Sequence, residues 1–169
     1  MDEQDGGPLL LARFLPYRLS VLANRASSSL AGQYSQRFGL SIPQWRVIAV
    51  LANEPGISAV EVAERTAMDE VAVSRAVSTL QRDGRIDRRP DATDGRRSRL
   101  ALSAAGQAVY AEVVPLARRF ERRLSAALPP SDRMALDRIL DRLLHELSPT
   151  SAGIEEASPS SRIIDDKPT

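Results

Sequence analysis

The sequence predicts a mainly α-helical fold with a small β-wing, built as a winged helix-turn-helix lobe flanked by helices from both ends of the chain. Two observations lead to this fold class. Apolar residues recur every three or four positions over most of the 169 residues, which indicates amphipathic helices. Between residues 85 and 102 the pattern changes to two short strands around a turn, directly after two short helices with a tight connection.

The composition is that of a globular protein without disulfides. Hydrophobic residues make up 43% of the chain, the net charge is +1, and cysteine is absent, which excludes disulfides and thiolate metal sites within the chain. No apolar run reaches the roughly 20 residues that span a bilayer, and residues 1–8 are acidic and glycine-rich, unlike a signal peptide. We therefore expect a cytoplasmic protein with a disordered N-terminus at 1–8 and no membrane partner.

The first expected helix covers residues 9–37. Its apolar stripe consists of Leu11, Leu15, Leu19, Leu22, Ala26, Leu30 and Tyr34. Pro16 should kink this helix or restart it, and Gly39 should end it as the residue after the C-cap. Ser41 is then expected to cap a second helix that reaches about Asn53 and contributes Val47, Ile48 and Leu51 to the core.

Two shorter helices follow with the spacing of a helix-turn-helix. Ser58 and Glu61 match a capping box at the start of a helix that ends near Arg65. Asp69 is expected to cap the second helix, which extends to Asp83. On a helical wheel its inward face is Val73, Ala76, Val77 and Leu80. Its outward face is small, hydroxyl-bearing or basic, and comprises Val71, Ser74, Arg75, Ser78 and Arg82.

An arginine-rich hairpin is expected directly after this helix. Residues 86–89 suit a first strand, 90–95 a turn and 96–102 a second strand. From Val71 to Leu102 the chain carries eight arginines against four aspartates, although the whole chain is almost neutral. A basic patch confined to one helix and one hairpin fits a DNA major groove and its flanking minor groove.

Two further helices are expected after the hairpin. Ser103 should cap the first, at 104–128, which Pro115 should bend and the prolines at 129–130 should stop. Ser131 is expected to cap the last helix, whose stripe is Leu136, Ile139, Leu140, Leu143 and Leu147. Residues 148–169 are rich in serine, proline and acidic residues, so we expect a disordered tail.

The terminal helices carry apolar stripes that the winged lobe at 41–103 is too small to cover. The simplest partner is the same surface of a second copy, so residues 9–40 and 104–147 are expected to form a helical dimerisation region. A two-fold dimer would hold two copies of the 69–83 helix about one helical turn of DNA apart. Such a homodimer suits a palindromic double-stranded DNA operator.

The most specific motif lies in the expected wing. It reads DGRR at 94–97 and continues through LALS at 100–103 to a glycine at 106, and segments 73–77 and 80–84 add to it. On these residues the chain from 9 to 147 resembles the MarR family of dimeric winged-helix transcriptional regulators. The resemblance implies that helix 69–83 enters the major groove, that a wing arginine enters the minor groove, and that effectors bind between the dimer helices and the DNA-binding lobe. Two positions depart from the family pattern, since Glu70 replaces a neutral or basic residue and Ser103 replaces a common threonine.

Residues of the helix-turn-helix and wing are expected to contact DNA, namely Ser58, Val71, Ser74, Arg75, Ser78, Arg82, Asp94, Arg96, Arg97 and Arg99. The ordinary alternative for such side chains is a solvated surface. The position of Arg75 on one helix face and of Arg96 at one hairpin tip favours DNA. Asp94 either begins the turn or also holds the Arg96 guanidinium in a fixed orientation.

A small-molecule effector is expected mainly because of the resemblance. Tyr17, Arg18, Trp45 and Arg46 are candidates to line a cleft for an aromatic or carboxylate-bearing molecule, with Trp45 stacking on it and Arg46 pairing with the anion. In the alternative interpretation, Trp45 packs within the lobe and Arg46 pairs with a helix carboxylate.

Other classes of function find little support. His145 and Asp141 share a helix face, but a metal site normally needs three or four ligands, so neither a metal nor a cofactor is expected. The chain has no nucleophile-elbow motif and no glycine-rich phosphate loop, which argues against an enzyme. A winged helix used only for protein–protein assembly stays open. The sequence therefore predicts a homodimeric DNA-binding regulator, a repressor released by a small molecule.

Overall fold

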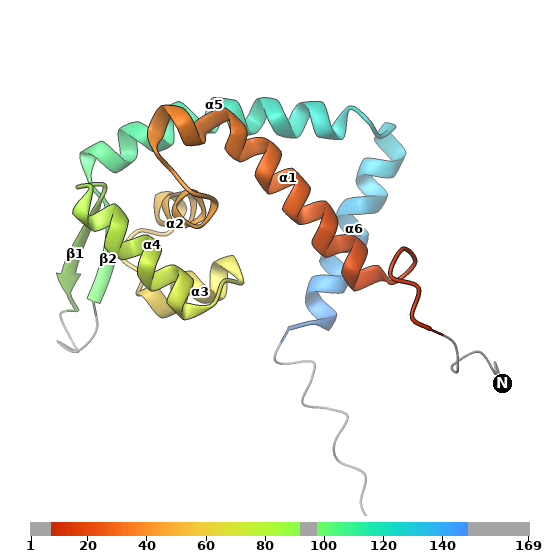
Figure 1. Cartoon of the computed structure of the whole chain (residues 1–169), viewed down its shortest axis with the longest axis horizontal. Helices are drawn as coiled ribbons and strands as arrows, with labels where there is room; N and C mark the ends of the chain where they lie inside the picture. Colours follow the sequence, from red (N-terminus) through yellow and green to blue (C-terminus); the bar gives the residue numbers. More distant parts are fainter. Residues whose placement is uncertain (1–7, 92–97, 149–169) are drawn as a thin grey trace, which may run out of the picture. The chain divides into compact units, whose positions relative to one another are not determined.

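The computed structural model describes residues 8–91 and 98–148 (Figure 1). These residues divide into two compact units, one up to Glu121 and one from Arg122 onwards. The elements, in chain order, are α1 (Leu15–Phe38), α2 (Ile42–Asn53), α3 (Ala59–Thr66), α4 (Glu70–Arg82), β1 (Ile86–Pro90), β2 (Ser98–Leu102), α5 (Ala104–Ser125) and α6 (Pro130–Glu146). The predicted fold class, mainly helical with a two-stranded wing, is confirmed. The expected disordered ends fall largely outside the described residues.

Helix α1 begins later than predicted. Residues 11–13 form a turn, and α1 starts at Leu15 with Pro16 in its first turn. Pro16 therefore starts this helix instead of kinking it, because the first turn needs no backbone N–H from that residue. At the other end Gly39 adopts φ 63°, and its N–H donates to the carbonyl of Ser35 at 2.8 Å, which confirms its predicted role.

The caps predicted for the next three helices are confirmed. Ser41 and Gln44 form a capping box at α2, and Ser58 and Glu61 form another at α3. The Asp69 carboxylate accepts the N–H of Ala72 at 2.8 Å at the start of α4. These local interactions fix where each helix of the helix-turn-helix begins.

The ends of α5 and α6 differ from the prediction. Helix α5 ends at Ser125 instead of residue 128, and α6 begins at Pro130 with Pro129 as its N-cap. Ser131 therefore lies inside α6, where its hydroxyl donates to Asp132 at 3.2 Å, and the prediction that it caps this helix is wrong. The physical reason is that a proline in the first helical turn has its φ already set for a helix.

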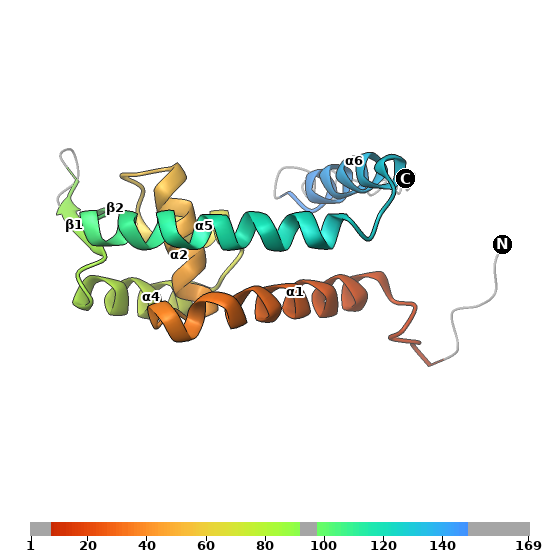
Figure 2. The same cartoon turned by 90° about the horizontal axis from the view of Figure 1, so that it is seen from above.

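The core of the first unit lies where α2, α3, α4 and the wing pack together. Helix α2 contacts α3, α4 and β2, and it lies between α4 and α5 in Figure 2. Its predicted core residues Val47, Ile48 and Leu51 are all buried. They pack with Val62, Val73, Leu80, Leu100 and Val113 from the neighbouring elements. Trp45 of α2 adds a ring contact to Tyr34 of α1 and a stacked contact to Tyr110 of α5, with ring centroids 5.7 and 6.0 Å apart.

The wing is an antiparallel pair of strands in which Ile86 pairs with Leu102 and Pro90 pairs with Ser98. Pro90 thus belongs to β1, not to the turn predicted at 90–95. Ile57 adds an isolated bridge to Leu100, so the chain before α3 runs beside β2. The hairpin tip, residues 92–97, lies outside the described residues.

Among those described, no helix is long and apolar enough to cross a membrane.

The base of the wing is joined closely to α5. Ser103 donates its hydroxyl to the carbonyl of Gly84 at 2.6 Å and its N–H to the carbonyl of Arg85 at 3.1 Å. Gly106 is buried beside the same Arg85 carbonyl, so close that a Cβ there would lie 2.1 Å from the oxygen. The Arg85 side chain donates to the carbonyl of Phe38 at 2.6 Å, at the end of α1. One turn therefore joins α1, the wing and α5.

Candidate nucleic-acid interface

Helix α4 has one face in the core and one in solvent, as predicted. Its inward residues are buried, and its outward residues are exposed: Val71, Ser74, Arg75, Ser78 and Arg82. Arg82 lies 3.6 Å from the carboxylate of Asp83 and remains largely exposed. This outward face is narrow, carries two hydroxyl groups and two guanidinium groups, and has no long apolar side chain. It is a surface that can approach a polar groove closely.

A groove of about 570 Å³ runs between α3, α4 and the wing. The polar side chains along it come from all three elements and include Ser58, Glu61, Ser74, Ser78, Arg88 and Ser98. The predicted contact residues Ser58, Ser74 and Ser78 thus meet in one concave surface. Hydroxyl groups of this kind donate readily to phosphate oxygens.

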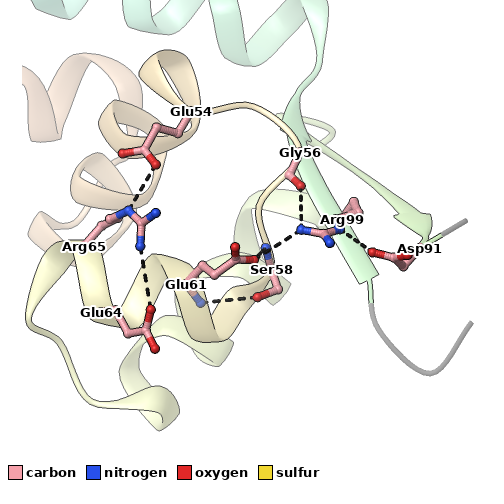
Figure 3. A network of polar contacts seen from close by, with 8 residues as sticks. All are labelled: Glu54, Gly56, Ser58, Glu61, Glu64, Arg65, Asp91 and Arg99. Carbon is pink, nitrogen blue, oxygen red and sulfur yellow. Dashed lines mark hydrogen bonds and ion pairs between the residues drawn. The ribbon is translucent and has the colours of Figure 1, made fainter. Parts of the chain in front are cut away.

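Arg99 links the wing to the start of α3 (Figure 3). Its Nε donates to the carboxylate of Asp91, and its Nη1 donates to the carbonyl of Gly56 at 3.2 Å and to Glu61 at 3.3 Å. These interactions engage Nε and Nη1 within the protein and leave the side chain 41% exposed, and we propose that Arg99 positions the wing instead of contacting DNA. Its role in this structure is to hold β2 against α3.

The electrostatics of this network favour its charged state. The backbone N–H of Ser58 donates to the Glu61 carboxylate at 2.8 Å, and this hydrogen bond is the largest cause that lowers the pKa of Glu61, with Arg99 and Arg65 adding to it. The hydrogen bond to Asp91 is the main cause that raises the pKa of Arg99. Both groups are therefore ionised at neutral pH, and the link is a charge-assisted one.

Comparison with known proteins identifies the family of this chain. The sequence profile of the MarR family matches residues 38–97, which include the helix-turn-helix. The chain is 31% identical to the transcriptional regulator HosA of Escherichia coli over 91 residues, which are 52% of this chain and 67% of that protein. The chain belongs to the MarR family.

Two further relatives extend the match over most of the chain. An HTH-type transcriptional repressor of Mycobacterium tuberculosis is 26% identical over 144 residues, which cover 85% of this chain and 98% of the repressor. The solved structure of the regulator PcaV of Streptomyces coelicolor, in complex with its natural ligand, is similar with a TM-score of 0.70 and 25% identity, over 84% of this chain and 99% of that one. This MarR-family chain is accordingly a transcriptional regulator and not an enzyme.

The structure separates the four predicted effector residues. Arg46 lies against α1, where its Nη2 contacts the hydroxyl of Ser27 at 3.3 Å, and Trp45 packs in the aromatic cluster with Tyr34 and Tyr110. Tyr17 and Arg18 lie near the start of α1, about 15 Å along the helix from Ser27 at 1.5 Å per residue. The four side chains therefore do not meet in one cleft within the described part of a single chain. Trp45 follows the alternative interpretation and packs within the lobe.

Some residues of the groove and of the Arg99 network were not among the predicted contact residues, and some predicted contact residues lie outside the described part of the chain. Asp91 and Arg88 were missed, although the alternation of residues on β1 points Arg88 to the groove side of the wing. Asp94, Arg96 and Arg97 lie outside the described residues. The described residues hold no group of three or more histidine or acidic side chains placed to bind a metal ion.

Proposed function

We propose that this MarR-family chain is a homodimeric repressor that binds a palindromic DNA operator, with α4 in the major groove and the wing arginines, including Arg96 and Arg97, in the flanking minor groove. The observation that carries the proposal is the outward face of α4, which combines exposed Arg75 with small Ser74 and Ser78 beside a concave groove. A helix with this face can bring its first turns to the base edges without a long apolar side chain holding the DNA away.

Selection from a random library of double-stranded DNA with the full-length protein tests this proposal. Binding to the selected sequence is then measured by fluorescence anisotropy for the wild type and for Arg75→Ala. We expect Arg75→Ala to cost about 1–3 kcal/mol and to relax the preference at one or two base pairs of each half-site.

Arg37→Ala is the matched control. It removes an exposed arginine of α1 that pairs with Glu112 of α5 at 2.7 Å, and neither residue lines the groove between α3, α4 and the wing. Its affinity for DNA should equal that of the wild type. An equal loss in both variants would mean that Arg75 acts only through general charge or folding, and it would contradict direct readout by α4.

The dimer is supported by exposed apolar side chains in each compact unit. The start of the chain and α1 expose Leu10, Leu15, Leu19 and Leu22, and α6 exposes Met134, Leu136, Ile139, Leu140 and Leu144. Contiguous apolar surface of this kind marks an interaction site on a monomer. A second copy of the chain is the expected partner, because a palindromic operator has two-fold symmetry and is matched by a two-fold dimer.

An effector site is proposed at Arg46 and the aromatic cluster of Trp45. Arg46 lies close enough to Tyr34 to oppose the rise in its pKa that burial causes, so a cation adjoins a group of three aromatic rings. Such a pairing suits an aromatic carboxylate. The similarity to PcaV, whose structure holds its natural ligand, adds support for a ligand in this chain.

The single tryptophan gives a direct assay for the effector. Benzoate and its ring-substituted derivatives are titrated against Trp45 fluorescence, and DNA release is followed with the same compounds. Arg46→Ala should weaken both effects together. A variant that keeps the affinity and the release of the wild type would exclude this site, and the same assay on Arg18→Ala tests whether the start of α1 takes part.

A further inference from the structure

Val71 is an apolar side chain in the middle of the face that is proposed to meet DNA. It lies in the first turn of α4, 59% exposed, almost diametrically opposite the buried Val73 and Leu80. A single exposed valine elsewhere on a protein surface needs no explanation. Here its neighbours on the same face are Ser74 and Arg75, so the valine interrupts an otherwise polar surface.

The first turn of α4 carries acidic side chains, which disfavour contact with a phosphate. The Asp69 carboxylate accepts the N–H of Ala72 at 2.8 Å, and Glu70 adds a second acidic group in the first turn. These charges occupy the positive end of the helix, where a phosphate would otherwise bind. These charges disfavour contact between this turn and a DNA phosphate, so a first turn that enters the major groove is expected to face the base edges.

The base edges of the major groove offer one apolar group, the C5-methyl of thymine, among hydrogen-bond donors and acceptors. Valine can neither donate nor accept, so opposite any other edge it would cover a polar group without pairing with it. Its β-branched side chain is also stiff, which suits a fixed contact. We propose that Val71 is a specificity-determining residue that packs against the C5-methyl of a thymine in each half-site; this inference rests on the proposed function.

The test removes the methyl from the DNA and the valine from the protein. The full-length protein first selects its sequence from a random duplex library. Each thymine of the selected half-site is then replaced in turn by deoxyuridine, which differs only in lacking the C5-methyl. For the wild type we expect one position at which this replacement weakens binding about fourfold, the loss that corresponds to one buried methyl group. For Val71→Ala that position should lose its sensitivity, while other thymines behave as before.

Val60→Ala is the matched control, because Val60 is exposed to a similar extent, 52%, and lines the same groove, but stands on α3 and not on the outward face of α4. It should keep the deoxyuridine effect of the wild type. Alanine has the higher helix propensity, so Val71→Ala should remain folded. A wild type that is indifferent to every replacement, or a Val71→Ala variant that keeps the effect, overturns this proposal while DNA binding itself stands. Failure of the wild type to select any DNA overturns the proposed function as well.

Discussion

Replacing Gly106 by alanine should destabilise the protein, although the same change usually stabilises a helix. An ideal Cβ at this position would lie 2.1 Å from the carbonyl oxygen of Arg85, about 0.9 Å inside the 3.0 Å that real Cβ atoms essentially never pass. That oxygen belongs to the backbone and also accepts the N–H of Ser103 at 3.1 Å, so it cannot move without weakening this hydrogen bond. Overpacking of this kind costs about 1–3 kcal/mol, against a gain of up to about 1 kcal/mol in helix propensity.

With the weakened hydrogen bond included, we expect a net loss of about 1–3 kcal/mol, or a melting temperature lower by about 2–12 °C for a chain of this size. Thermal unfolding followed by circular dichroism measures the shift. Gly32→Ala is the matched control, because Gly32 lies within α1 and a Cβ there would meet nothing within 4 Å. It should leave the melting temperature unchanged or raise it. A Gly106→Ala variant that melts at or above the wild-type temperature would refute the close-contact reasoning.

Arg99→Gln should weaken operator binding without changing its salt dependence, because Arg99 is proposed to position the wing and to neutralise no phosphate. Anisotropy titrations at several salt concentrations measure the slope of the logarithm of affinity against the logarithm of salt concentration. A smaller slope for the variant would mean that Arg99 contacts a phosphate. Glu61→Gln should lower stability at neutral pH but not in acid. The folded pKa of Glu61 lies below its unfolded value, so its contribution is complete above the unfolded value near 4.5 and is lost as the pH falls through the folded pKa. Urea unfolding at about pH 7 and about pH 3 checks this, and a gap between the two proteins that persists in acid would contradict it. Deleting residues 135–169 should turn a dimer into a monomer or an aggregate in light scattering, whereas a well-behaved dimer would place the interface elsewhere.

The salt slope of the wild type also separates the two classes of function that the sequence left open. DNA binding that neutralises phosphates gives a steep fall in affinity, with a slope of about −0.9 for each phosphate contact. A winged helix that serves only protein–protein assembly would retain no duplex from the random library. Membership of the MarR family supports the first outcome.

The sequence determined the features that depend on neighbours along the chain. Caps at Ser41, Ser58 and Asp69 were predictable because the side chain and the N–H that it accepts are three residues apart. The two faces of α4 were predictable for a similar reason, since the helical period alone assigns each residue to a side. The same local reasoning went wrong at Ser131, where two prolines compete for the start of the helix and the one at Pro130 sets it.

Only the tertiary structure decided which arginines face outward and which serve the fold. Arg75 and Arg99 look equally available in the sequence, but Arg99 meets a carboxylate that lies 38 residues away and a carbonyl that lies 43 residues away. The sequence around Gly106 does not indicate that the backbone carbonyl of Arg85, in the turn before β1, lies where a Cβ atom would stand. The helical and strand periods indicate only which face of its own element a residue occupies. The partner of a charged side chain, and the atoms beside a glycine, come from elements that are distant in the sequence, so only the packing of those elements determines them. The sequence therefore predicted which face of α4 is exposed, and the fold decided which residues hold that helix in position.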